Sequence, residues 1–475
     1  MKSWTIRIVS AIIVLGAIYF SITEIISCNK KYETANKFTS LVFTFSTQAQ
    51  LTGLWKGELN AATQNLKLNI KFYEENGKLA GNIDIPEQYA FGLKLSSIKE
   101  TQNNIKFEVI ISSALTMKFD GTLAGDYIKG NFDQMGIAGT FELKKERTNE
   151  EEVIFYNDKI KLCGTLSIPD RNKKNPAVIL ISGNAQNRDE AFGFPIYKIL
   201  SDTLTKNGYA VLRFDSRGIG SSDGVLMDIN YDDLSSDISS AINLLKKHEY
   251  IDANKIGLMG HCEGGAVASI TAVKTKDVGF IILLAGTGDY GSNILVEQSS
   301  KIARLEGVPE KDVIRDSIIN TSIVNTVIHD TGWVNSKLMF RKYVNIMLET
   351  DTTLTEVKKK ELAEQILQTN VATWKQPWFK AFLTTNPADY LEQINIPVLA
   401  IFAEKDVTAL TSCQKIETVL KRSKNKNYKI ITVPNANHLF QISETGLPSE
   451  FPVLKKEFEP SLLPAIIDWL NKTVK

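Results

Sequence analysis

Three residues in the second half of the chain have the types and the order that nucleophilic catalysis needs. Cys262 stands in the string Gly260-His261-Cys262-Glu263-Gly264, and Asp406 and His438 follow it, acid before histidine. A thiolate is a strong nucleophile, an imidazole can take and return its proton, and a carboxylate can orient that imidazole. We therefore predict Cys262 as nucleophile, His438 as general base and Asp406 as the orienting acid, acting through an acyl-enzyme.

Each predicted catalytic residue follows, within a few positions, an apolar run that is typical of a buried strand. The runs are 255–259 before Cys262, 397–402 before Asp406 and 430–434 before His438. The carboxyl ends of parallel strands meet at one edge of a sheet, so we expect the three side chains to converge there. Glycines two residues before and after Cys262 favour a strained strand-to-helix turn that exposes the nucleophile, because bulk at either position would clash.

The other histidines are weaker candidates for the base. His248 lies in a charged run that indicates a solvated helix end, and His329 lies in a helical region where a surface or packing role is expected. His261 precedes the nucleophile, and we expect its side chain to point away from the nucleophile's side of the turn. His438 is therefore the predicted base.

The composition bounds the kind of protein. A chain of 475 residues predicts two or three domains, and 43% hydrophobic with 23% charged residues is typical of globular proteins. The net charge is +1 with no basic stripe, which argues against nucleic acid as a partner. The four cysteines have no paired or metal-ligand spacing, so we predict neither a disulfide framework nor a metal or cofactor site.

Residues 1–50 are predicted to be an export or anchoring region. Two early basic residues precede the apolar stretch 11–20, which suits a signal peptide better than a full membrane span. Three alternatives stay open: lipidation at Cys28 behind a lipobox-like string, cleavage after Ala49, or an uncleaved anchor that attaches the protein to a membrane. All three place the catalytic part outside the cytoplasm.

Residues 51–147 are predicted to form a small all-β meander, as a barrel or a sandwich. Strict apolar/polar alternation over 66–72 and 104–109 is the signal of half-buried strands, and we count about eight such strands. The segment carries no histidine and no cysteine, so a catalytic role is not expected. A spacer, a ligand-holding barrel and a dimerisation surface all remain open.

From 148 to 475 the pattern changes to strands alternating with helices, which predicts an α/β class with a mostly parallel sheet. The charged run 144–152 marks the boundary. Between about 286 and 389 the strand signals stop and helical periods recur. We interpret this insertion as a helical cap over the active site.

Three strings carry a resemblance to a known family. They are Ile181–Glu190 (ISGNAQNRDE), Phe214–Ser222 (FDSRGIGSS) and Asn437–Gln441 (NHLFQ). They resemble motifs of secreted bacterial α/β-hydrolases of the EstD esterase type, although the first string is one residue shorter and lacks a proline. The likeness covers nearly the whole exported chain, including a preceding β-rich domain. It implies an α/β-hydrolase fold with a cap and a carboxylic ester hydrolase, in which Cys262 replaces the serine of these relatives.

The resemblance and the turn geometry together imply an oxyanion hole. Its donors would be the backbone N–H of Glu263 and N–H groups of the Gly183-Asn184 turn. We expect the charged residues of the motif strings to brace loops rather than to contact the substrate. They are Arg188, Asp189, Glu190, Asp215 and Arg217. The Glu263 side chain is expected either to be solvated or to contact a polar residue of the cap.

A cysteine nucleophile favours activated esters, thioesters or lactones as small-molecule substrates, because a thiolate is expelled more readily than an alkoxide. Dienelactone hydrolases and bile acid-CoA acyltransferases resemble this chain in using cysteine on the same fold. Two alternatives to ester hydrolysis remain: an acyltransferase, and a catalytically degenerate binding protein. The intact Asp406 and His438 argue against the second.

Overall fold

The computed structural model describes residues 51–61, 64–75, 78–88, 90–101, 103–112, 115–146, 149–183, 186–225, 228–349, 351–408 and 412–474. The predicted export region, with Cys28 and Ala49, lies outside these residues, as does Asn184. The described chain separates into two compact units between Glu150 and Glu151, close to the boundary expected at 147. Among the described residues, no helix combines the length and the apolar character that crossing a membrane requires.

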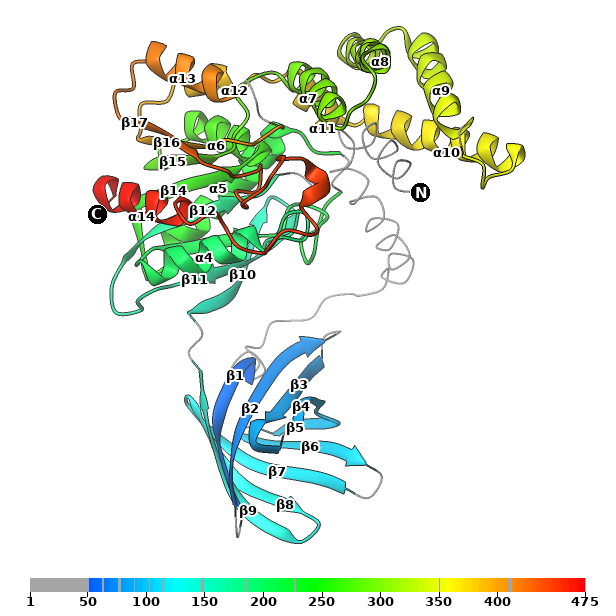
Figure 1. Ribbon diagram of the computed structural model, residues 1–475. Helices are drawn as coiled ribbons and strands as arrows, with labels where there is room; N and C mark the ends of the chain where they lie inside the picture. Colours follow the sequence, from blue (N-terminus) through cyan, green and yellow to red (C-terminus); the bar gives the residue numbers. More distant parts are fainter. Residues whose placement is uncertain are drawn as a thin grey trace. The chain divides into compact units, whose positions relative to one another are not determined.

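The first unit is one antiparallel sheet, nine-stranded in its described residues. Its strands are β1 (Gly53–Ala61), β2 (Gln64–Glu75), β3 (Lys78–Ile85), β4 (Ala90–Lys94), β5 (Ser97–Thr101), β6 (Asn104–Ser112), β7 (Leu115–Ala124), β8 (Tyr127–Gln134) and β9 (Ile137–Lys145). Strands that are consecutive in sequence are paired except β4 and β5, the two edges, and β1 also pairs with β9. The sheet curls until β4 approaches β6 (Figure 1). The predicted meander is confirmed, as a single curled sheet with one strand more than the pattern suggested.

The interior of this unit is filled by side chains from alternate strand positions. In β7, Met117, Phe119 and Leu123 are buried while their neighbours are exposed. Phe107 stacks on Phe119 with ring centroids 4.6 Å apart. Such alternation is what a sheet with one apolar face requires.

The second unit is built on an eight-stranded sheet in its described residues. Its strands are β10 (Glu150–Asn157), β11 (Ile160–Ser167), β12 (Asn175–Ile181), β13 (Ala210–Phe214), β14 (Ile251–His261), β15 (Phe280–Leu284), β16 (Val398–Ala403) and β17 (Tyr428–Val433). The order is β10-β11-β13-β12-β14-β15-β16-β17. Pairing is parallel from β13 to β17, and β11 pairs with β13 antiparallel. The carboxyl ends of β14, β16 and β17 therefore share one edge, as the catalytic prediction requires.

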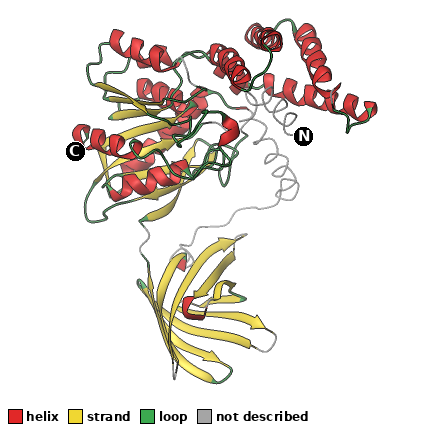
Figure 2. Cartoon of the chain, in the orientation of Figure 1, coloured by secondary structure: helices red, strands yellow, loops and turns green. Residues whose placement is uncertain are grey.

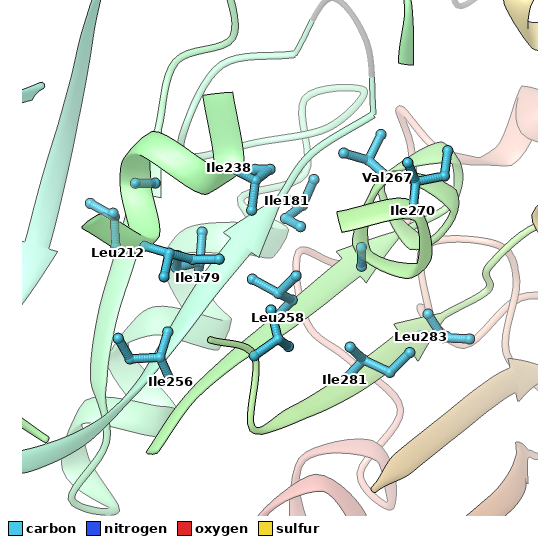
Figure 3. Close-up of a cluster of buried hydrophobic side chains, with 14 of the residues drawn as sticks. Ile179, Ile181, Leu212, Ile238, Ile256, Leu258, Val267, Ile270, Ile281 and Leu283 are labelled. Atoms are coloured by element: carbon cyan, nitrogen blue, oxygen red, sulfur yellow. The ribbon is translucent and has the colours of Figure 1, made fainter. Parts of the chain in front are cut away.

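Helices cover both faces of this sheet (Figure 2). They are α4 (Ile196–Lys206), α5 (Tyr231–Lys247), α6 (Glu263–Lys274), α12 (Pro387–Leu391), α13 (Ser412–Arg422) and α14 (Leu462–Thr473). Figure 3 shows the face on which Ile179 and Leu258 of the sheet meet Ile238 of α5 and Val267 of α6. On the opposite face, β-strand residues such as Val178 pack against α4 and α14. Both faces are buried, which is why the strands read as continuous apolar runs.

A helical insertion separates β15 from β16, where the cap was expected (Figure 1). It comprises α7 (Gly291–Leu305), α8 (Glu310–His329), α9 (Trp333–Glu349), α10 (Glu356–Trp374) and α11 (Pro377–Thr384). Its helices have an apolar core of their own that includes Phe340, Trp374, Phe379 and Leu383. Beside this core lies a cavity of about 60 Å³. The insertion is thus a packed helical body that is continuous with the sheet unit.

Candidate active site

Cys262 occupies a strained turn between β14 and α6. Its φ of 55° and ψ of −121° are unusual for a non-glycine residue, and strain of this kind is common at nucleophile turns. A Cβ at Gly260 would lie 2.1 Å from the Gly264 carbonyl oxygen. A Cβ at Gly264 would lie 2.2 Å from the carbonyl oxygen of Ile181. The two glycines are therefore required by the close approach of α6 to β14 and to the end of β12.

The three predicted catalytic side chains meet at the carboxyl edge of the sheet. Asp406 follows β16, and its Oδ2 lies 2.7 Å from Nδ1 of His438, which follows β17. Both side chains are buried. Asp406 Oδ1 also accepts hydrogen bonds from the backbone N–H and the hydroxyl of Thr408. The Cys262 side chain lies close enough to the imidazole to affect the pKa of His438, so the three side chains form one cluster.

The electrostatics of this cluster favour a charged imidazole. Burial lowers the pKa of His438, but the Asp406 carboxylate and the Cys262 side chain outweigh it and raise that pKa well above its usual value. Burial raises the pKa of Asp406, yet His438 and Thr408 bring it below its ordinary value. A protonated imidazole beside an ionised carboxylate can stabilise a thiolate at Cys262.

The loop that carries His438 is shaped by its own side-chain and backbone hydrogen bonds. Asn437 Oδ1 accepts from the backbone N–H groups of Leu439 and Gln441, at 2.9 and 3.0 Å. The Asn437 N–H in turn donates to the Gln441 carbonyl oxygen at 3.0 Å. These bonds close a tight turn that presents the imidazole at the edge of the sheet.

His261 contributes to the site although the sequence assigned it no role there. Its Nε2 lies 3.0 Å from the His438 carbonyl oxygen, and the two rings lie 4.8 Å apart. Burial and the nearby charge of His438 lower the pKa of His261 to about 3, so it stays neutral and its Nε2–H donates to that carbonyl. By contrast, His248 lies at the C-terminal end of α5 beside Glu151, and His329 ends α8. Adjacency to the nucleophile was the signal that could have marked His261.

The predicted oxyanion-hole donors are described in part. Glu263 is the first residue of α6, where backbone N–H groups point out of the helix. Gly183 follows β12 and lies near Tyr197, whose hydroxyl donates to Gln186 Oε1 at 2.6 Å. Tyr197 is buried, and nothing in the sequence pattern pointed to it. Since Asn184 lies outside the described residues, this oxyanion hole stays a prediction.

The Glu263 side chain is neither solvated nor in contact with a polar side chain of the cap, because its partner there is the indole N–H of an aromatic residue. Glu263 is 8% exposed, and its Oε1 accepts a hydrogen bond from Trp378 Nε1 at 2.6 Å. Trp378 belongs to α11. The solvated alternative is therefore excluded.

The charged motif residues brace loops, as expected. Asp215 accepts from the backbone N–H and the guanidinium of Arg188, both at 3.0 Å. Arg217 donates two hydrogen bonds to Asp237 of α5, at 2.7 and 2.8 Å. A Cβ at Gly220 (φ +56°) would lie 2.4 Å from an Asp215 carboxylate oxygen, so the glycine makes room for that carboxylate. These ion pairs hold the loops after β12 and β13 in place.

No group of three or more histidine, cysteine or carboxylate side chains within the described ranges has the arrangement of a metal site.

Comparisons with known proteins find several similar chains. An uncharacterized 31.7 kDa protein of the traX-finO intergenic region of Escherichia coli is 31% identical over 152 residues, or 31% of this chain and 51% of the relative. Thiohydrolase aneE of Aspergillus aculeatus is 29% identical over 139 residues, or 29% of this chain and 42% of the relative. The chain thus spans about half the length of these curated relatives. Among solved structures, the alpha/beta hydrolase GrgF from Penicillium sp. sh18 is 18% identical with a TM-score of 0.43, covering 68% of this chain and 99% of that one.

The family model of the alpha/beta hydrolase fold matches residues 176–445, more than half of the chain. The match runs from β12 past His438 and includes the strand-to-helix turn that carries Cys262 (the nucleophile elbow) and the cap. It confirms the predicted fold class and, at the coarse level of a hydrolase, the predicted kind of enzyme. The chain belongs to the alpha/beta hydrolase fold family.

Proposed function

We propose that the protein hydrolyses carboxylic esters or thioesters through Cys262, His438 and Asp406. The observation that carries the proposal is the contact of Asp406 Oδ2 with His438 Nδ1 at 2.7 Å, on an imidazole whose pKa the neighbouring Cys262 side chain also raises. A degenerate site would have no need of a buried carboxylate and imidazole held in this relation, since burying them costs free energy.

The first half of the reaction forms an acyl-enzyme. The Cys262 thiolate attacks the carbonyl carbon, a C–S bond forms, and the negative charge moves to the carbonyl oxygen. When the tetrahedral intermediate collapses, the C–O or C–S bond to the leaving group breaks. The imidazolium of His438 gives its proton to the departing alkoxide or thiolate, while Asp406 stabilises the charged ring before that transfer.

The second half releases the acid and restores the enzyme. Neutral His438 removes a proton from water, the resulting hydroxide attacks the acyl carbon, and the bond to Cys262 breaks. The products are a carboxylic acid and an alcohol or thiol, with the thiolate–imidazolium pair regenerated. Backbone N–H groups of Glu263 and of the Gly183-Asn184 turn are the proposed donors to the oxyanion in both halves.

The nucleophile favours substrates with good leaving groups. A thiolate is expelled from the tetrahedral intermediate more easily than an alkoxide, so activated esters and thioesters are the proposed substrate class. One curated relative is named a thiohydrolase, which agrees with this class. Membership of the secreted bacterial EstD-type group and a location outside the cytoplasm are part of the same proposal.

The test is a panel of p-nitrophenyl esters from acetate to octanoate, with one acyl-CoA thioester. We expect turnover of short activated esters by the wild-type protein. Cys262→Ala should lose roughly 10³-fold or more in kcat, because the covalent route is removed. Cys262→Ser should keep part of the ester activity, because the elbow, the base and the oxyanion donors remain.

Cys413→Ala provides the matched control, since Cys413 is a half-buried thiol on α13 that packs against the apolar core of the sheet unit. It should retain wild-type kcat. Undiminished turnover in Cys262→Ala would refute the mechanism. Transfer of the acyl group to an added amine or alcohol in preference to water would instead identify an acyltransferase, and no turnover of any panel member would favour a binding protein.

A further inference from the structure

Glu263 places a buried carboxylate beside the nucleophile that the proposed reaction does not use. Its backbone N–H is assigned to the oxyanion, but its side chain has no part in the proton transfers. A carboxylate at 8% exposure needs hydrogen-bond donors to be tolerated. The groups that surround the Glu263 carboxylate therefore indicate the role of this side chain.

The first donor comes from the cap. Trp378 Nε1 lies 2.6 Å from Glu263 Oε1, a short distance that fits a hydrogen bond to a charged acceptor. Trp378 is the second residue of α11, so this bond ties the start of that helix to the first residue after the nucleophile.

The second neighbour comes from the sheet unit. Tyr231, the first residue of α5, lies next to Glu263, and burial together with that side chain raises the pKa of the Tyr231 hydroxyl. In addition, Glu263 lies in the first turn of α6, where the helix dipole favours a negative charge. Glu263 therefore links α6, α5 and the cap helix α11 at one point.

The helix held in this way presents aromatic rings near the site. Trp378 and Phe382 are stacked, with centroids 5.9 Å apart and an angle of 17° between their planes, and both are half-buried. Phe379, between them in sequence, is buried in the core of the cap. Trp378 and Phe382 pack against the edge of that core, and the indole N–H of Trp378 reaches from there to the Glu263 side chain.

We infer that Glu263 is a positioning residue that fixes α11 beside Cys262, so that Trp378 and Phe382 form a wall selecting substrates with a flat, apolar acyl group. The substrate half of this inference rests on the proposed ester hydrolysis. The anchoring half stands on the Glu263–Trp378 contact alone.

The experiment compares Glu263→Gln, Trp378→Phe and the double variant with the wild type. The readouts are kcat and KM for p-nitrophenyl benzoate and p-nitrophenyl acetate. Each single change should reduce the preference for benzoate over acetate roughly tenfold, mainly through KM, as expected for loss of a hydrogen bond to a charged group. The double variant should lose no more than the larger single change, because both remove one interaction.

Trp333→Phe is the matched control. Trp333 Nε1 makes the same kind of bond to a carboxylate, Asp330 Oδ1 at 2.8 Å, but at an exposed end of α9. This variant should leave the benzoate preference unchanged. An equal effect of Trp333→Phe and Trp378→Phe, or additive effects of Glu263→Gln and Trp378→Phe, would overturn the inference.

Hydrogen exchange in α11 of the ligand-free protein tests the anchoring without turnover. Glu263→Gln and Trp378→Phe should each speed amide exchange across Pro377–Thr384 roughly tenfold, while Trp333→Phe should not. Unchanged exchange in Trp378→Phe would refute the anchoring. Absence of ester turnover in the wild type would instead refute the proposed function and, with it, the selecting wall.

Discussion

The two units of the chain bury different kinds of side chain. Within the described part of the β unit, the side chains that are fully buried are apolar, with Trp55, Phe107 and Phe119 among the largest. The sheet unit also buries charged and polar residues, including Glu263, Asp406 and His438. Burying a charged or polar group costs free energy that hydrogen bonds must offset, so the polar interior of the sheet unit depends on its hydrogen bonds while the interior of the β unit does not. We therefore expect the chemistry in the sheet unit, and we expect apolar packing to hold the β unit together.

The largest expected effect tests the polar interior directly. His438→Ala should reduce kcat roughly 10³- to 10⁴-fold on any ester that the wild type turns over, because both proton transfers pass through this imidazole. His329→Ala, at the end of α8, is the control and should have wild-type kcat. Steady-state kinetics of the two variants measures both values of kcat. A wild-type kcat in His438→Ala would refute the catalytic role of the cluster.

The second prediction concerns the apolar interior. Phe107→Ala should lower the free energy of unfolding of the β unit by about 3–5 kcal/mol, the usual cost of emptying a phenylalanine site, and leave kcat unchanged. Phe280→Ala in β15, another fully buried phenylalanine, should destabilise the sheet unit to a similar extent and reduce activity. Hydrogen exchange followed separately in β7 and α6 would measure both losses. A fall in kcat caused by Phe107→Ala alone would show that the β unit takes part in the reaction.

The same contrast explains how far the sequence could predict the fold. Buried parallel strands read as apolar runs, so the places of Cys262, Asp406 and His438 at their ends could be predicted from local pattern. The sequence predicts an antiparallel meander but not the number of its strands. Short strands such as β4, in which Phe91 is exposed, do not show the regular apolar/polar alternation from which strands are counted.

Contacts between distant segments could not be predicted in this way. Tyr197 meets Gly183, and Trp378 meets Glu263 across 115 positions, only because helices pack over the carboxyl edge of the sheet. His261 contacts the His438 carbonyl oxygen because the loop after β17 passes beside it. Its place next to Cys262 could mark it as a candidate, but the local sequence does not reveal that contact.

The smallest expected effect is a pH dependence of the stability of the sheet unit, caused by a histidine of its polar interior. His261 has a folded pKa of about 3, below the usual value near 6.5, so the unfolded chain binds a proton more readily between these pH values. This histidine therefore makes stability fall as pH falls from about 6.5 toward 3, by about 3 kcal/mol at pH 4. His261→Gln cannot titrate, and its stability relative to the wild type should rise by about that amount between pH 7 and pH 4.

Exchange of α6 amides at the two pH values measures this difference, with His329→Gln as a control that should show none. A difference between wild type and His261→Gln that does not vary with pH would show that His261 is not buried in its neutral form.

The most direct test of the account is to identify the residue that carries the acyl group. Rapid acid quenching during turnover of a slowly deacylating p-nitrophenyl ester, followed by mass spectrometry of the digested protein, locates that residue. We predict one acyl mass on the peptide that contains Cys262, absent in Cys262→Ala, with Cys413 unmodified. An acyl group on another residue, or an unmodified Cys262 during steady turnover, would contradict the account.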